Sequence, residues 1–166
     1  NGHKNMRNIL RIFITLSLLT TTIQVYPQIS LEQQSELDSL NEIITRSNQD
    51  SIIGEAYTNI GMLYNKLSFI DSSLNYFNTG LTFNLRSGNK VKIGNNYNNI
   101  GYIYNKKGEI KKALVNHNLS LSIREEIGDK AGMAESYNNL GIIYYYQDEK
   151  EQAVKYLEKS LEMKRS

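Results

Sequence analysis

The chain contains no cysteine and only two histidines, His3 and His117, among its 166 residues. Without cysteine it can form no disulfide, and it has neither a thiolate metal ligand nor a thiol nucleophile. His117 has no Asp, Glu or Cys at a spacing that would orient its ring for catalysis, so we interpret it as a structural side chain between helices. These absences predict a protein that is not an enzyme and that carries neither a metal site nor a cofactor.

An excess of charge of one sign is also missing. The 19 Lys and Arg nearly balance the 17 Asp and Glu, and the formal net charge of +2 does not favour nucleic acid or another acidic partner. The stretch 88–94 contains Gly and Lys but lacks the spacing of a phosphate-binding loop, so we interpret it as a turn. With 40% hydrophobic and 22% charged residues, the chain has the composition of one ordinary globular domain.

What the sequence does contain is one motif in three copies. The copies are YTNIGMLY at 57–64, YNNIGYIY at 97–104 and YNNLGIIY at 137–144, and they recur every 40 residues. A fixed period of this size is typical of a solenoid, in which each unit buries its apolar face by stacking on its neighbours.

The apolar positions within each copy predict a helix. Tyr97, Ile100 and Tyr104 fall at i, i+3 and i+7, which is one stripe of a helix and not one face of a strand. The glycine inside each copy costs about 1 kcal/mol relative to alanine, so we expect a neighbouring helix to approach too closely for a Cβ atom. A small residue twelve positions later is expected to face that glycine. The positions that form this pattern are Tyr57, Gly61, Tyr64, Ser73, Tyr97, Gly101, Tyr104, Ala113, Tyr137, Gly141, Tyr144 and Ala153.

Short polar turns lead from each motif into a second apolar-periodic segment, and turns of this length require antiparallel neighbours. The second segments run at about 71–87, 109–127 and 149–165. Gly88 and Gly128 are placed to end two of these helices in the left-handed conformation, and Asn89 and Asp129 follow as N-caps of the next helices. The chain therefore reads as three antiparallel helix pairs.

These helix pairs resemble the tetratricopeptide repeat. The family's pattern of an aromatic residue, Leu-Gly, Tyr and a small Ala is met in the third copy by Tyr137, Leu140, Gly141, Tyr144 and Ala153, and at the matching positions of the other copies. The period is longer than the commoner unit of about 34 residues and is similar to a 40-residue branch with an extended second helix. The resemblance implies an all-α fold, a right-handed solenoid of antiparallel helix pairs, that binds proteins or peptides.

The segment ahead of the repeats carries a targeting pattern. We interpret residues 1–5 as a non-native or over-read start, because Met6 follows them. Residues 6–28 combine a basic front with an apolar run at 12–19, which is typical of a secretory signal peptide and shorter than the roughly 20 residues of a spanning helix. Because no small-residue cleavage site is present, a membrane anchor at residues 6–25 stays open as the alternative. Membrane contact is expected only through this segment.

The remaining chain divides by the repeat period. Amphipathic periodicity predicts a leading helix within residues 29–50, which we interpret as the second helix of a degenerate repeat. Three repeats follow it, at residues 51–88, 89–128 and 129–166.

The resemblance implies that the first helices line a concave face, where a row of amides recurs at one register. Amides offer both donors and acceptors, so Asn59, Asn99 and Asn139 can hydrogen-bond the backbone of an extended peptide. The alternative is that these amides bond the adjacent repeat. Glu55 and Glu135 beside them disfavour a ligand carboxylate. The predicted peptide-binding residues are Asn59, Met62, Asn98, Asn99, Tyr102, Asn138, Asn139 and Ile142.

From these features we expect a protein- or peptide-binding scaffold that forms the sensory or interaction part of an exported bacterial protein of the periplasm or cell envelope. The alternative is the N-terminal regulatory fragment of a longer signalling protein, a sensor kinase or transcription regulator, with its catalytic or DNA-binding module after residue 166. An uncapped apolar face of Val154, Leu157 and Leu161 in the last repeat further predicts homo-oligomers.

Overall fold

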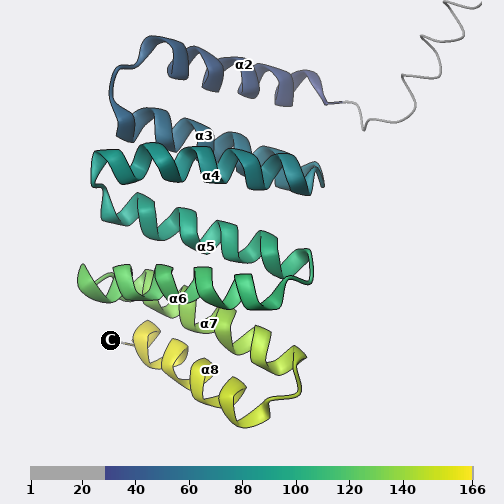
Figure 1. Ribbon diagram of the computed structural model, residues 1–166, viewed down its shortest axis with the longest axis vertical. Helices are drawn as coiled ribbons and strands as arrows, with labels where there is room; N and C mark the ends of the chain where they lie inside the picture. Colours follow the sequence, from purple (N-terminus) through teal and green to yellow (C-terminus); the bar gives the residue numbers. More distant parts are fainter. Residues whose placement is uncertain (1–28, 166) are drawn as a thin grey trace, which may run out of the picture.

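The computed structural model describes residues 29–165, and every regular element in that range is an α-helix. The helices are α2 (Leu31–Arg46), α3 (Asp50–Lys66), α4 (Ile70–Ser87), α5 (Lys90–Lys106), α6 (Ile110–Glu126), α7 (Lys130–Tyr146) and α8 (Lys150–Arg165). Figure 1 shows them stacked along one axis in chain order, from α2 at one end to α8 at the other. The predicted all-α solenoid is confirmed, whereas the segments predicted at 1–5 and 6–28 lie outside the described residues.

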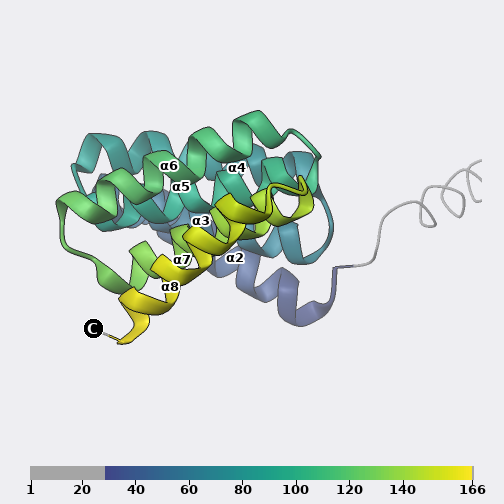
Figure 2. The ribbon, with the colours of Figure 1, turned by 90° about the horizontal axis from the view of Figure 1, so that it is seen from below.

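The helices associate as pairs. α3 packs most extensively on α4, α5 on α6 and α7 on α8, while α4 contacts α5 and α6 contacts α7 to join one pair to the next. The predicted leading helix α2 packs on α3. Figure 2, seen from below, shows α8 running obliquely across the helices behind it, so the stack twists from pair to pair.

Local capping ends and begins the helices where the sequence predicted it. Gly88 has a φ of 67° and Gly128 a φ of 69°, both in the left-handed region. The side chain of Asn89 accepts a hydrogen bond from the backbone N–H of Lys92, and Asp129 caps α7 in the same way. These four predictions are confirmed.

The turn inside each helix pair also uses a left-handed residue, at positions that are 40 residues apart. Ser68 has a φ of 65°, Gly108 a φ of 73° and Asp148 a φ of 61°. Only the second of these turns has the residue type that adopts this backbone without a steric cost. The first and third turns therefore carry local strain.

The glycines of the repeated motif lie against large side chains of the second helix. The contacts are Gly61 with Phe77, Gly101 with His117 and Gly141 with Leu157. A Cβ atom added to Gly61 would lie 2.7 Å from Cδ1 of Phe77, so the predicted close approach is confirmed. The small residue also contacts the glycine, as predicted, since Ser73 donates a 2.8 Å hydrogen bond to the carbonyl of Gly61. The atoms nearest to the missing Cβ, however, belong to the residue four positions after the small one.

Apolar clusters between successive layers hold the stack together. Leu40 of α2 packs with Ala56 and Ile60 of α3, which attaches the leading helix to the first pair. The two other clusters are Phe77, Ile100 and Ile103 between α4 and α5, and Leu121, Tyr137 and Leu140 between α6 and α7. Full burial of each large apolar side chain contributes about 1.5–3 kcal/mol.

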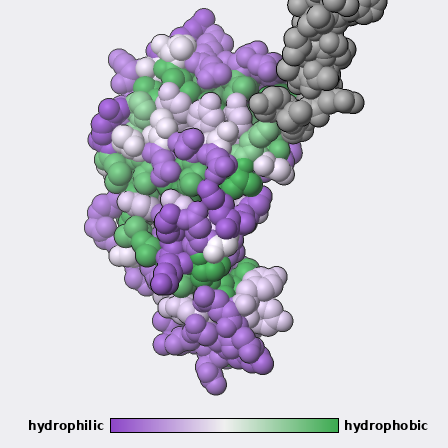
Figure 3. All heavy atoms as spheres, turned by 45° about the vertical axis from the view of Figure 1, so that its right-hand side comes forward, coloured by the Kyte–Doolittle hydropathy of each residue, from purple (hydrophilic) through white to green (hydrophobic). Residues whose placement is uncertain are grey.

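The C-terminal end of the stack is only partly apolar. Val154 and Leu161 of α8 are each about half exposed, but Leu157 is partly buried beneath Gly141. The predicted apolar face therefore shrinks to two residues, and the lower end of the molecule is mainly hydrophilic in Figure 3. No helix in the part of the chain that the structure describes has the length and apolar character required to cross a bilayer.

Candidate functional site

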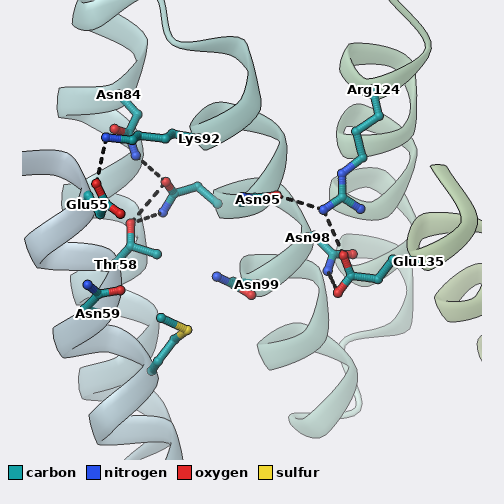
Figure 4. A pocket seen from close by; sticks show the side chains of 12 residues that line it. Glu55, Thr58, Asn59, Asn84, Lys92, Asn95, Asn98, Asn99, Arg124 and Glu135 are labelled. Carbon is teal, nitrogen blue, oxygen red and sulfur yellow. Dashed lines mark hydrogen bonds and ion pairs between the residues drawn. The ribbon is translucent and has the colours of Figure 1, made fainter. Parts of the chain in front are cut away.

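A hollow of about 400 Å³ opens over the first helices, with α3 on one side, α5 in the middle and α7 on the other side. Figure 4 shows the side chains that surround it. They are Glu55, Thr58, Asn59, Met62, Asn84, Lys92, Asn95, Asn96, Asn98, Asn99, Arg124 and Glu135. Four of the eight predicted peptide-binding residues, namely Asn59, Met62, Asn98 and Asn99, line this hollow.

Helical periodicity brings these side chains together. On α3 the lining residues Glu55, Thr58, Asn59 and Met62 follow a spacing of i, i+3, i+4 and i+7, which is one stripe of a helix. The same register on α5 supplies three more of the lining residues. The opposite stripe of each helix carries the buried apolar residues, so the polar stripe is left to face the hollow.

Two amides in the hollow bond no side chain or backbone group within residues 29–165. Asn59 and Asn99 are partly buried, and neither side chain bonds any residue that the structure describes. Figure 4 shows both without a dashed line, one on α3 and the other on α5. Each therefore offers two N–H donors and a carbonyl acceptor to the space between them.

The third amide of the row is tied to the protein. Asn139 donates a 2.9 Å hydrogen bond to Oδ1 of the buried Asn98, and it does not line the hollow. In the preceding repeat, the position that corresponds to Asn98 is occupied by Thr58. Its hydroxyl bonds the carbonyl of Gly54 and the side-chain amide of Asn96, and it does not bond Asn99. Bonding to the adjacent repeat, which was the alternative interpretation of the amide row, therefore applies to Asn139 and not to Asn99.

Asn98 also determines which ring nitrogen of His117 carries the proton. Nδ1 of His117 lies 3.0 Å from Oδ1 of Asn98, while Nδ2 of Asn98 donates to Glu135 at 3.0 Å. An amide oxygen only accepts, so His117 carries its proton on Nδ1. Burial, followed by the charge of Arg124, lowers the pKa of His117 from 6.5 to about 4. The ring is neutral at pH 7 and 1% exposed, in the structural role predicted for it.

Arg124 is the residue that sequence reasoning missed. It is 2% exposed, and Nη1 donates to the carbonyl of Gly132 at 2.7 Å and to Ser136 at 2.9 Å. Nη2 donates to Asn95 and Glu135, both at 2.9 Å. Arg124 therefore links α5, α6 and α7 beneath the hollow.

The signal for this buried arginine is the small residues around it. A Cβ atom added to Gly132 would lie 2.6 Å from Cδ of Arg124, so only glycine leaves room for the side chain there. The equivalent positions of Arg124 in the other second helices hold Asn84 and Lys164. Because an arginine on an amphipathic helix is usually exposed, its burial does not follow from the sequence of α6 alone.

The other half of the hollow has its own polar floor. Lys92 donates to the carbonyl and hydroxyl of Ser51 at 2.9 and 2.8 Å and pairs with Glu55 at 2.8 Å. Asn96 is fully buried, accepts from Asn84 at 2.6 Å and donates to Thr58 at 3.0 Å. These bonds join α3, α4 and α5 at the base of the hollow.

The other predicted contact residues lie outside the hollow. Tyr102 and Ile142 occupy the same register as Met62 on the next two first helices, and all three side chains are between 38% and 46% exposed. Asn138 is partly buried and does not line the hollow. Within residues 29–165 no three His, Asp or Glu side chains lie together as a metal site requires.

Comparison with known proteins finds one matching family model and similar solved structures. Residues 92–166 match the family model described as Tetratricopeptide repeat. Among solved structures, the chain is similar to BtubC (BKLC) from P. vanneervenii, with 18% identity and a TM-score of 0.71, over 81% of this chain and 55% of that one. It is also similar to MamA, with 22% identity and a TM-score of 0.60, over 78% of this chain and 67% of that one.

The chain thus spans about half the length of BtubC. A sequence search of curated proteins finds no match. At these identities the structural likeness shows the fold alone. Residues 92–166, which match the family model, belong to the tetratricopeptide repeat family, whose members are typically non-catalytic scaffolds for protein interaction.

Proposed function

We propose that this protein is a non-catalytic scaffold whose hollow binds an extended peptide segment of a partner protein. The observation that carries the proposal is the pair of unpartnered amides, Asn59 and Asn99, on adjacent repeats of one polar stripe. Because neither amide bonds another described residue, both remain available to a ligand. An extended backbone supplies a carbonyl and an N–H at regular intervals, so it satisfies both amides without requiring a particular ligand sequence.

Exposed apolar side chains beside the amides support the same proposal. Met62, Tyr102 and Ile142 recur at one register on consecutive first helices, and each is more than a third exposed. Met and Tyr are enriched at protein interfaces, where they provide apolar contact area. Ligand side chains on one side of the segment pack on this row while its backbone bonds the amides.

Affinity capture tests this proposal. The full chain is used to capture proteins from a membrane-and-envelope extract, beside the double variant Asn59→Ala/Asn99→Ala. The control is Asn78→Ala/Asn118→Ala, which removes two exposed amides that bond only their own helices, α4 and α6. We expect the control to retain the captured proteins and the groove variant to lose them with unchanged helicity by circular dichroism. Equal capture by a folded groove variant would contradict the proposal.

The cellular place is a proposal of its own. We propose that the protein is exported to the periplasm or cell envelope, and the support is the basic front and apolar run within residues 6–28. Fractionation of cells that express the tagged natural protein tests this. The alternative role, as the regulatory part of a sensor kinase or transcription regulator, is decided by reading the gene beyond residue 166.

We also propose self-association through α8. In α6 the equivalent residues are Leu121, which clusters with Tyr137 and Leu140 of the next repeat, and Leu114, which packs against that cluster. By contrast, Val154 and Leu161 are each about half exposed. Light scattering of the full chain is expected to show a mass that rises with concentration, and Leu161→Glu is expected to abolish the rise. A monomer at every concentration would exclude this interface.

A further inference from the structure

Two ion pairs face the hollow, and in each pair the carboxylate is the exposed partner. Glu55 pairs with Lys92 at 2.8 Å, and the two side chains are 57% and 25% exposed. Glu135 pairs with Arg124 at 2.9 Å, and here the side chains are 56% and 3% exposed. A ligand that enters the hollow therefore meets carboxylate oxygens before it meets either cation.

The two cations have no accessible donor left for a ligand that enters the hollow. An ammonium group has three donors, and Lys92 directs them to the carbonyl of Ser51, the hydroxyl of Ser51 and Glu55. The four Nη donors of Arg124 are matched by four acceptors within the protein. Its Nε is buried and makes no hydrogen bond with any described residue. A ligand carboxylate consequently finds no accessible cationic donor here.

The two carboxylates still have acceptor capacity. An ionised carboxylate has roughly four lone-pair sites. Glu55 uses one of them, on Oε2, for Lys92, and Glu135 uses one on each oxygen, for Asn98 and Arg124. Since both side chains are more than half exposed, the remaining sites can accept hydrogen bonds from a ligand.

From this imbalance we infer that the peptide bound in the hollow carries basic side chains, lysine or arginine, that pair with Glu55 and Glu135. The inference rests on the proposed peptide-binding function. Glu55 lies on α3 and Glu135 on α7, with Asn99 of α5 between them (Figure 4). A segment that crosses the first helices places its backbone on the amides and one basic side chain toward each carboxylate.

The selectivity is short-range, because the four charges of the two ion pairs sum to zero. Pairing between exposed charges changes affinity by roughly 1.5-fold to fivefold for each pair and weakens with salt. Removal of both carboxylate charges, with the cations left in place, gives the hollow two uncompensated positive charges. The preference of the hollow should then change from basic to acidic peptides.

An array of short synthetic peptides of defined sequence, acetylated and amidated so that no terminal charge remains, tests this inference on the full chain. The variant is Glu55→Gln/Glu135→Gln, whose amide oxygens can still accept from Lys92 and Arg124. The control is Glu158→Gln/Glu162→Gln, which removes two exposed charges from α8, outside the hollow. We expect the wild type and the control to select peptides with two basic residues. The groove variant should bind those peptides roughly twofold to 25-fold more weakly and gain acidic ones.

The outcomes separate the two proposals. If peptides bind in a manner that depends on Asn59 and Asn99 but are not enriched in lysine and arginine, the charge inference is overturned and the scaffold function stands. Selection of acidic peptides by the wild type overturns the inference in the same way. If the wild type selects no peptide, the proposed function fails and the inference fails with it.

Discussion

Two glycines in the middle of helices should respond in opposite directions to the same substitution. Gly61 of α3 and Gly94 of α5 are both buried, and replacing a helical glycine with alanine gains about 1 kcal/mol of helix propensity at either position. What differs is the space for the new methyl group. At Gly94 the nearest atom, Cγ of Arg124, would lie 3.5 Å from the added Cβ, which is ordinary contact.

At Gly61 the added Cβ would lie 2.7 and 2.8 Å from two carbons of Phe77, against an optimum of about 3.5–4.0 Å. Phe77 is 2% exposed and packs on Ile100 and Ile103, so its ring cannot turn toward solvent. Overpacking of this kind costs about 1–3 kcal/mol. After the propensity gain, Gly61→Ala should lower the free energy of unfolding by up to about 2 kcal/mol, whereas Gly94→Ala should raise it by about 1 kcal/mol.

Thermal and urea denaturation followed by circular dichroism measure this difference of about 1–3 kcal/mol, which corresponds to melting temperatures separated by on the order of 10 °C. The wild type lies between the two variants. If Gly61→Ala melts at or above Gly94→Ala, then the close contact of α3 with Phe77 does not restrict position 61, and the packing explanation of the motif glycine is refuted.

Three further predictions concern pH and local backbone. The pKa of His117 is about 4 in the folded state and about 6.5 in the unfolded state, so the unfolded state binds more protons between these values. The contribution of His117 to the free energy of unfolding is therefore fully present above pH 6.5 and falls by about 3 kcal/mol toward pH 4. Urea denaturation across this range should show this loss in the wild type and a smaller loss in His117→Leu, and an equal dependence on pH in both proteins would contradict the argument. Ser68→Gly should raise the free energy of unfolding by up to about 1 kcal/mol because it removes a left-handed non-glycine residue. The reverse change at the same register, Gly108→Ser, should lower it. If both variants shift the melting temperature in the same direction, the turn is not strained. The N-cap residue of α3, Gln49, makes no side-chain capping bond, so Gln49→Asp should stabilise the fold by about 0.5–1 kcal/mol. Asp129 does cap α7, so Asp129→Ala should destabilise the fold by about 1 kcal/mol. An unchanged melting temperature for Gln49→Asp would contradict the capping argument.

The sequence alone was sufficient for the helices and their ends. Its 40-residue period, the i, i+3, i+7 stripe and the short turns predict antiparallel helix pairs, and the second helices α4, α6 and α8 begin and end within one residue of the expected places. Caps such as Gly88 and Asn89 were equally readable. Each of these features depends on residues three or four positions away along one helix, so the local sequence contains all the atoms involved.

The partners of the motif glycines and of the amides were decided only in the folded stack. Ser73 contacts Gly61 as expected, but the space at the missing Cβ is filled by Phe77 one turn further on, because side chains of crossing helices interdigitate. Asn99 and Asn139 are the same residue at the same register. One is unpartnered and the other bonded, since the preceding repeat offers Thr58 in the first case and Asn98 in the second.

The burial of Arg124 also depends on residues of other helices. Along α6 it occupies an ordinary position for a charged residue, but Gly132 of α7 leaves the space into which it is buried. Its four acceptors come from two other helices. The sequence by itself therefore determined the repeat, the helices and the polar stripe that faces the hollow. Which amides stay free and which charges are exposed was decided by tertiary contacts, because those depend on residues from neighbouring helices that meet only when the repeats stack.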